Sequence, residues 1–408
     1  MPKLMIIADD LTGAIDTGVQ LAEQGVSTLV IPELSQDKHL FDFEAIVTNT
    51  ETRHGSPTEA LDAVARAVAF GHGLGVKHFY KKTDSTLRGN LGSEFEALMK
   101  ATREKQLFFV PAFPRLQRTT CQGQQYVNGV ELQKSDFATD PLNPIVTSDV
   151  ATLVRQQAQV DTHHVSAAEL GCLFETRKDG VYIFDCTTDA DMQSIAVALQ
   201  HVRGLTNLAG SGGFAPHLKS VLNLKASDVE AVPKVPGAML VVNGSLNPGA
   251  QRQLSFAARS GFVVIRVDPH DLENQSGAKQ TTTGIAEEIV NRLRTENSVV
   301  LATTSNRHSM HASSTMLSIS ERLGELVSEI VHSANLSLLT VFGGDTLSAV
   351  ARNLKCQRIL PLAEVLPGIP LSKFYMCGSE LLVVSKAGGF GADDILPAIS
   401  KSLQRFRQ

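Results

Sequence analysis

Tryptophan is absent from this chain of 408 residues, and tyrosine occurs only four times. Proteins that bind single-stranded nucleic acid commonly stack bases on aromatic side chains, so this shortage disfavours that class. Surplus positive charge is missing too, because 37 Lys and Arg stand against 42 Asp and Glu, a formal net charge of −5. Phosphate backbones and anionic membranes are bound mainly through such a surplus. Nucleic acid and membrane surfaces are therefore not expected as partners.

Cysteine and long hydrophobic runs are also scarce. The five cysteines are odd in number and scattered, and no pair has the C-x-x-C spacing of a zinc or redox site. The first apolar run ends at Asp9 and Asp10, far short of a signal peptide or membrane span. Histidines form no H-E-x-x-H motif and serines no G-x-S-x-G elbow, which disfavours a metalloenzyme and an α/β hydrolase. We expect a soluble cytoplasmic protein without its own metal site.

What is present is a regular alternation of short apolar runs and amphipathic segments. This alternation predicts the α/β class, with two α/β domains, each a largely parallel sheet flanked by helices. Residues 231–237 (AVPKVPG) are typical of a stiff linker, so the expected domains are 1–230 and 238–408. Poor periodicity over about 114–175 predicts an inserted hairpin or a lid-like excursion. A cleft between the domains is the default expectation for the active site.

Polar residues gather where predicted strands end in the first half, which is where α/β proteins bind ligands. Asp9 and Asp10 follow the first strand; one of them is as readily explained as a helix cap. Arg53 follows the third strand and, taken alone, could be a surface residue. The segment KKTDSTLRGN, residues 81–90, is the densest group, and it is either a solvated loop or a site built around a charged ligand. Arg115 and Arg118, after another strand, are weaker candidates.

Glycine-rich junctions mark the second half. Three of them lie between a predicted strand and a helix: NGSLNPGAQ (243–251), FGGDT (342–346) and SKAGGFGADD (385–394). Glycines allow close backbone approach, and a helix N-terminus offers free N–H groups, so together they make a phosphate cradle. None of the three is a Walker A sequence or the G-x-G-x-x-G of a dinucleotide fold. Any one alone could be a turn, but three in one domain indicate nucleotide binding.

The motifs ADDLTGA, KKTDSTLRGN, PAFP, GS followed by Gln253, GGDT and KAGGFG occur in this order along the chain. In that order and spacing the chain resembles the four-carbon acid sugar kinase family over essentially its whole length. The resemblance implies a two-domain ATP-dependent kinase that phosphorylates the terminal hydroxyl of D-threonate, D-erythronate or 3-oxo-tetronate, with D-threonate as first choice. This chain departs from the usual pattern at Asn247 and Ala250, and it has KAGGFG where KSGNFG is more usual.

The resemblance and the residues together suggest roles. We expect Asp84, or else Asp9 or Asp10, to be the base that accepts the hydroxyl proton, and Mg²⁺ to accompany ATP. Arg53, Lys81 and Lys82 would anchor the substrate carboxylate, while Thr83 and Ser85 would orient hydroxyls. The expected nucleotide-binding residues are Ser245, Gly343, Gly344, Asp345, Thr346, Gly388 and Gly389.

Two other classes of function use the same residues. A non-catalytic sugar-acid sensor could bind its ligand in the same cleft, although three phosphate loops are more than binding requires. A lyase could form a Schiff base through Lys81 or Lys82. A homo-oligomer is possible.

Overall fold

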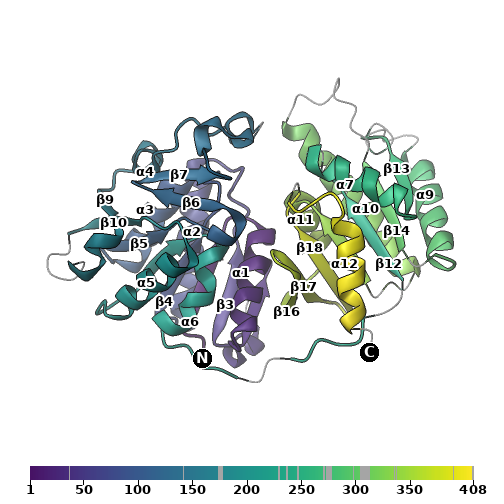
Figure 1. The fold of residues 1–408 in the computed structure, drawn as a ribbon. Helices are drawn as coiled ribbons and strands as arrows, with labels where there is room; N and C mark the ends of the chain where they lie inside the picture. The colour runs from purple at the N-terminus through teal and green to yellow at the C-terminus, as the bar shows by residue number, and fades with distance from the viewer. Residues whose placement is uncertain are drawn as a thin grey trace. The chain divides into compact units, whose positions relative to one another are not determined.

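A computed structural model of the chain falls into two compact units, Met1–Val229 and Glu230–Gln408 (Figure 1). The structure describes residues 1–35, 37–140, 142–172, 178–227, 230–235, 238–245, 248–269, 272, 278–296, 298–303, 313–334, 336, 338–388 and 390–406. Two residues of the expected linker, 236 and 237, lie outside that set. No helix of the described part is both long and apolar enough to span a bilayer.

Short apolar segments of the N-terminal unit assemble into one parallel sheet. The strands are β1 (Leu4–Ala8), β2 (Thr28–Ile31), β3 (Ala45–Asn49), β4 (His78–Lys82), β5 (Gln106–Val110), β9 (Thr162–Val165), β10 (Gly180–Phe184) and β11 (Asn207–Gly210). They lie in the order β2-β3-β1-β4-β11-β5-β10-β9, and every neighbouring pair is parallel. All five residues of β1 are fully buried, as expected for a strand covered on both faces.

Helices cover both faces of this sheet. They are α1 (Leu11–Glu23), α2 (Pro57–Gly73), α3 (Leu91–Thr102), α4 (Val150–Gln157), α5 (Asp189–Gln200) and α6 (Leu218–Val221). Helices α1, α5 and α6 share one face, and α2 and α3 pack together on the other (Figure 1). Helix α2 begins after Ser56, whose hydroxyl and the Glu59 carboxylate form a reciprocal capping box.

The excursion expected near residues 114–175 begins as a small antiparallel sheet. Its strands are β6 (Arg118–Cys121), β7 (Gln124–Val127) and β8 (Val130–Glu131), so the predicted hairpin is confirmed. The later part of the segment is more regular than predicted, because it contains α4 and the edge strand β9 of the main sheet. Strand β9 reads THHV, too short and too polar to show a strand pattern.

The C-terminal unit has a mixed sheet. Its strands are β12 (Met239–Asn243), β13 (Val263–Val267), β14 (Ser298–Thr303), β15 (Leu338–Phe342), β16 (Arg358–Leu366), β17 (Ile369–Met376) and β18 (Ser379–Lys386). Strands β13-β14-β12-β15-β18 are parallel in this order, and β16, β17 and β18 form an antiparallel meander. The helices are α7 (Pro248–Arg259), α9 (Ala278–Leu293), α10 (Ser313–Ala334), α11 (Gly344–Asn353) and α12 (Ile395–Leu403). Short 3-10 helices of the N-terminal unit are η1 (Lys38–Asp42), η2 (Pro114–Leu116), η3 (Leu132–Lys134), η4 (Asp136–Thr139), η5 (Ala167–Cys172) and η6 (Gly212–His217), and the C-terminal unit has η7 (Gln404–Phe406).

The two units wind their first four strands alike. In the N-terminal unit the order is β2-β3-β1-β4, and in the C-terminal unit it is β13-β14-β12-β15. In each unit the chain leaves the first strand in one direction and later crosses it in the other. Ligands in such sheets bind at the carboxyl ends of the strands where the winding direction reverses. The fold therefore places one candidate site after β1 and β4, and another after β12 and β15.

Candidate functional site

Two carboxylates at the end of β1 hold one guanidinium at the end of β3. Arg53 Nε and Nη2 donate to the two oxygens of Asp9 at 2.8 and 3.0 Å, and Nη1 donates to Asp10 Oδ2 at 2.7 Å. Asp10 also caps α1, because its Oδ1 accepts from the Gly13 amide at 2.9 Å. Burial alone raises the pKa of Asp9, but Arg53 and the neighbouring lysines outweigh it and lower that pKa. Asp9 is thus an ion-pair partner and Asp10 both a partner and a cap.

The adjacent lysines of β4 point to opposite faces of the sheet, as successive strand residues do. Lys81 is fully buried, and its ammonium lies 3.1 Å from Glu94 Oε2 on α3 and donates to the Lys82 carbonyl at 3.0 Å. Glu94 Oε1 accepts from the Thr52 hydroxyl at 2.6 Å. Burial raises the pKa of Glu94, and Lys81 opposes that rise without cancelling it. Lys81 is therefore engaged inside the protein.

Lys82, in contrast, reaches the start of α1. A Cβ added to Gly13 would lie only 2.7 Å from the ammonium of Lys82, a residue that is 5% exposed. No carboxylate of the described residues lies within ion-pair distance of it. The hydroxyls of Thr12 and Thr83 are buried and also lack hydrogen-bond partners within the described chain. Buried polar groups without partners are costly, so these three point to a ligand that carries negative charge and hydrogen-bonding groups.

Asp84 follows Thr83 and forms the core of the KKTDSTLRGN segment. Its Oδ2 accepts from Arg88 Nε at 2.6 Å and from the Thr86 hydroxyl. Burial raises the pKa of Asp84, but the guanidinium groups of Arg88 and Arg53 outweigh burial and hold that pKa far below its ordinary range. Asp84 is therefore a carboxylate at any physiological pH.

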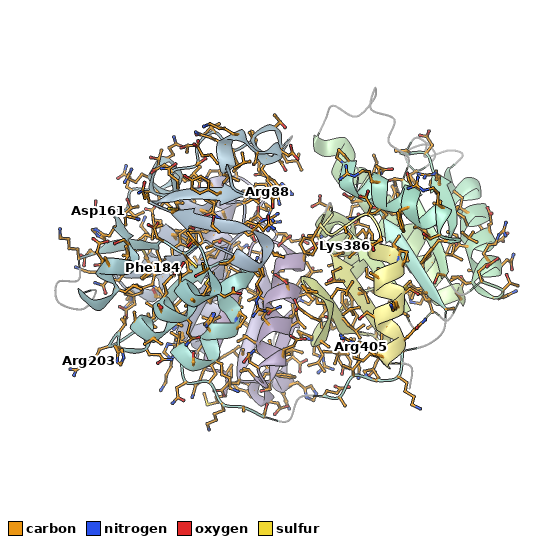
Figure 2. The ribbon with its side chains drawn as sticks, in the orientation of Figure 1. Arg88, Asp161, Phe184, Arg203, Lys386 and Arg405 are labelled. Carbon is orange, nitrogen blue, oxygen red and sulfur yellow. The ribbon has the colours of Figure 1, made fainter. Side chains whose placement is uncertain are left out.

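The excursion that contains β6 to β8 packs against this segment. Arg88 Nη1 donates to Asp140 Oδ2 at 3.0 Å, and its guanidinium lies 5.3 Å from the centre of the Phe137 ring. Gln125 of β7 donates to the Ser85 carbonyl at 3.0 Å. Figure 2 shows Arg88 on the side of the unit from which β6 and β7 project. The excursion thus fixes the loop that carries Asp84 and Ser85.

The three candidate bases differ in what remains free. Both oxygens of Asp9 accept from Arg53, and the oxygens of Asp10 accept from Arg53 and Gly13. At Asp84, Oδ2 is occupied, whereas none of the described residues donates to Oδ1. Asp84 alone of the three has a carboxylate oxygen to which no described residue donates.

Of the two arginines that follow β5, one faces the candidate site. Arg118 is partly buried, its Nε lacks a partner among the described residues, and burial lowers its pKa while Asp84 lies close enough to raise it. Arg115 is exposed and pairs with Asp189 at 3.5 Å. Arg118 therefore joins Lys82 as a second cation of the site without a carboxylate partner in the described chain.

In the C-terminal unit, three loops meet at the ends of β12, β15 and β18. A Cβ added to Gly244 would lie 2.1 Å from the Thr346 hydroxyl, and one added to Gly388 would lie 2.6 Å from the Ser245 hydroxyl. Gly343 has φ +107°, a conformation that favours glycine, and its Cα faces the same two side chains. Gly389 lies outside the described residues, as do Leu246 and Asn247.

This cradle offers donors to an anion. Helix α11 begins at Gly344 and has no side-chain cap at its N-terminus, so its first amides are free of that competitor. Asn243 is fully buried, and its Nδ2 has no partner among the described residues although its Oδ1 accepts from the Ser245 amide at 3.0 Å. The phosphates of a nucleotide would fit this cradle. Its glycines allow close approach, and the backbone amides of α11 and the side-chain amide of Asn243 can donate hydrogen bonds. Within the described chain no cluster of three or more His, Cys, Asp or Glu could hold a metal ion.

Two family models match the chain. A sugar-binding N-terminal domain matches residues 4–218, and a nucleotide-binding C-terminal domain matches residues 240–396. A D-threonate kinase of Salmonella typhimurium strain LT2 is 31% identical over 417 residues, which cover 97% of this chain and 96% of that protein. The chain belongs to the four-carbon acid sugar kinase family.

A further relative and a solved structure are also similar to the chain. A 3-oxo-tetronate kinase of Cupriavidus necator is 26% identical over 434 residues, covering 98% of this chain and 97% of its own. A crystal structure of a protein from Salmonella typhimurium LT2 has a TM-score of 0.82 at 22% identity, with each chain covered in full, and shares the fold. The family resemblance predicted from the motifs is confirmed, and so is the α/β fold class.

Three residues of the sugar-binding unit that matter in this kinase had weak sequence signals or none. Glu94 occupies the same helical face as Leu91 and Leu98, which are buried, so a carboxylate there was detectable as a buried charge. Arg118 stood out only as one of two arginines in a loop. Asp140 gave no signal, because it lies 52 residues from Arg88 in a segment without periodicity.

The assignment of Lys81 to a buried ion pair predicts a characteristic pattern of stability. Glu94→Leu should destabilise the protein by about 3–5 kcal/mol, because it leaves a buried ammonium without its partner. The double variant Lys81→Met/Glu94→Leu should recover most of that loss. Denaturant unfolding followed by circular dichroism measures both. If the double variant were no more stable than the single one, the pairing would not be what holds Lys81.

Proposed function

We propose that this kinase transfers the γ-phosphoryl group of ATP to the terminal 4-hydroxyl of a four-carbon sugar acid, with D-threonate as its first substrate. The observation that carries the proposal is the N-terminal site: two cations without carboxylate partners in the described chain beside unpartnered hydroxyls and one carboxylate with a free oxygen. An anionic polyol supplies what these groups lack. The name of the Salmonella typhimurium relative supports the choice of D-threonate, and that of the Cupriavidus necator relative keeps 3-oxo-tetronate as the alternative.

The substrate carboxylate would bind Lys82 and Arg118. Arg53 and Lys81, also expected as anchors, have their charges balanced by Asp9, Asp10 and Glu94. Their part in the site is to position those carboxylates and the strand ends that bear them. Thr83 would donate its buried, unpartnered hydroxyl to a substrate hydroxyl, and Ser85 remains a candidate for the same task.

Asp84 would act as the base. Oδ1 accepts the proton of the attacking hydroxyl, the hydroxyl oxygen forms its bond to the γ-phosphorus, and the bond from that phosphorus to the bridging oxygen of ADP breaks. A carboxylate with so low a pKa is a weak base. In a loose transition state, however, the proton leaves late, so orientation of the hydroxyl matters more than basicity. Arg88 and Thr86 on Oδ2 hold Oδ1 in one direction.

The phosphates of ATP would bind in the cradle of the C-terminal unit. Ser245, Gly343, Gly344, Thr346 and Gly388 surround it, and Gly389 is expected there from the sequence. Asp345, in the first turn of α11, would offer a carboxylate to the Mg²⁺ that accompanies ATP. Bound to the phosphates, that ion would neutralise charge that develops during transfer. The expectation that the two ligands meet in a cleft between the units stays a prediction, as do a cytoplasmic location and a homo-oligomer.

The reaction is tested directly by ADP release over a panel of D-threonate, D-erythronate, 3-oxo-tetronate and longer aldonates. We expect ATP turnover that depends on a four-carbon acid, highest with D-threonate, and a product one phosphoryl group heavier by mass spectrometry. Turnover with longer aldonates alone would contradict the proposal, and the order among the four-carbon acids decides between the two named substrates.

If Asp84 is the base, replacing its carboxylate should lower kcat, whereas replacing a control carboxylate should not. Asp84→Asn should lower kcat by about 10²–10⁴-fold, because an amide cannot accept the proton. Asp185→Asn is the matched control: Asp185 also follows a strand of this sheet, β10, but its oxygens accept from the amides of Gln122 and Gly123. Near-normal turnover of Asp84→Asn would exclude Asp84 as the base.

The assignment of the carboxylate anchors predicts changes in sugar-acid affinity. Lys82→Met and Arg118→Gln should each raise the KM for the sugar acid by about tenfold or more, since each removes a charge-assisted hydrogen bond. The KM for ATP should change little. Arg115→Gln, in the 3-10 helix just before β6 and exposed, should behave as wild type. If Arg115→Gln and Arg118→Gln had equal effects, Arg118 would not be an anchor.

A further inference from the structure

Lys386, the last residue of β18, is a buried cation that the proposed reaction does not use. Its side chain is 1% exposed, and its ammonium donates to the carbonyls of Ala387 and Phe390, each at 2.9 Å, and to that of Gly388. The ring of Phe342 lies 4.2 Å from the same nitrogen. Figure 2 shows Lys386 near the end of β18. Burial lowers the pKa of Lys386 to about 7, whereas the carbonyls and the ring face favour the charged form.

The three carbonyls account for all three N–H bonds of the ammonium. Lys386 therefore has no donor left for a phosphate. Its hydrogen bonds instead fix the conformation of the loop that follows β18. A trans peptide points its N–H opposite to its C=O. Because the Ala387 carbonyl is turned toward Lys386, the amide of Gly388 points away from it. Gly388 is the residue whose Cα lies against the Ser245 hydroxyl in the cradle.

Lys386 is also linked to a second loop of the cradle, the one that follows β15. Phe342 of β15 and Lys386 of β18 are register partners in the parallel sheet, and the Gly343 amide donates to the Lys386 carbonyl at 3.0 Å. Phe342 and Gly343 lead directly into α11. Lys386 thus contacts the segment before the α11 N-terminus and the loop that bears Gly388.

A buried glutamine completes the arrangement. Gln253 of α7 is fully buried, and its Nε2 donates to the carbonyls of Phe390 and Gly391 at 3.0 and 2.9 Å. The Phe390 carbonyl is therefore held by Lys386 and Gln253 together. A loop whose carbonyls are fixed inward in this way presents its free amides on the other side, as an anion-binding turn does.

We propose that Lys386 is a positioning residue for the nucleotide: it gathers the carbonyls of the loop after β18 so that the amide of Gly388 faces the phosphates of ATP. This inference rests on the proposed function, because it names the ligand as a nucleoside triphosphate. A buried ammonium is costly to maintain, and hydrophobic residues would fill its place in the core more cheaply. An ammonium at this position is explained if it organises the phosphate site.

The test is ADP binding by isothermal titration calorimetry to full-length wild type and Lys386→Met. We expect the variant to raise the Kd for ADP by about tenfold or more, since a free loop loses the preorganised amides. The KM for the sugar acid should stay within about twofold of wild type, a split that a general loss of structure would not give. Hydrogen exchange around Gly388 without nucleotide should be faster in the variant.

Lys373→Met is the matched control. Lys373 is a buried lysine on the neighbouring strand β17, but its ammonium pairs with the carboxylates of Glu230 and Glu380. It should bind ADP as wild type does. Equal affinity of wild type and Lys386→Met would overturn the role of Lys386 alone, whereas a wild type that bound no ADP would overturn the proposed nucleotide site as well.

Should Lys386→Met fail to fold by circular dichroism, Lys386→Arg takes its place. A planar guanidinium keeps the charge but cannot converge on three carbonyls as an ammonium does. We expect it too to weaken ADP binding while leaving the sugar-acid KM unchanged. Wild-type affinity in this variant would mean that charge alone is sufficient, and the positioning role would be excluded.

Discussion

The sugar-binding unit depends on how buried charge is compensated at one edge of its sheet. An ion removed from water needs a partner, and Arg53, Lys81 and Arg88 each have at least one carboxylate within hydrogen-bonding distance. These pairs hold the strand ends in register and give the edge its shape. Among the described residues, Lys82 and Arg118 have no carboxylate within ion-pair distance, and in the proposed function a substrate carboxylate takes that place. In that proposal, the paired cations hold the structure of the site and the other two bind the substrate.

The two units have the same order in their first four strands but carry different groups at the strand ends. Both candidate sites lie at the carboxyl edge beside the first strand of the unit, β1 or β12. The first unit places charged side chains there, which suits a small polyol whose hydroxyls have to be distinguished one by one. The second places glycines and helix amides there, which suits phosphates that are the same in every nucleotide. Because the strand order is shared, the difference in ligand preference comes from the residues in the loops.

Much of this could be predicted from the sequence, for physical reasons that also set the limit. Strands buried on both faces, such as β1, are continuous apolar runs, and Ser56 with Glu59 is a local signal for a helix start. The sequence pattern indicated neither the central strand β11, which has four residues, nor the β16–β17 hairpin. Which lysine of β4 is paired could not be predicted either. That outcome depends on Glu94, which approaches Lys81 only after α3 has packed on one face of the sheet.

The nucleotide cradle shows why its side chains can vary more than its backbone. At Ala250 and within KAGGFG the chain departs from the usual family pattern, yet Ala250 is buried in α7 and the cradle still closes through Gly388. A contact made by a peptide N–H does not depend on which side chain the residue bears, so such substitutions need not disturb it. A side chain that fixes the peptide planes is different. If Lys386 sets the direction of those amides, a substitution at Lys386 should change the backbone conformation of the loop.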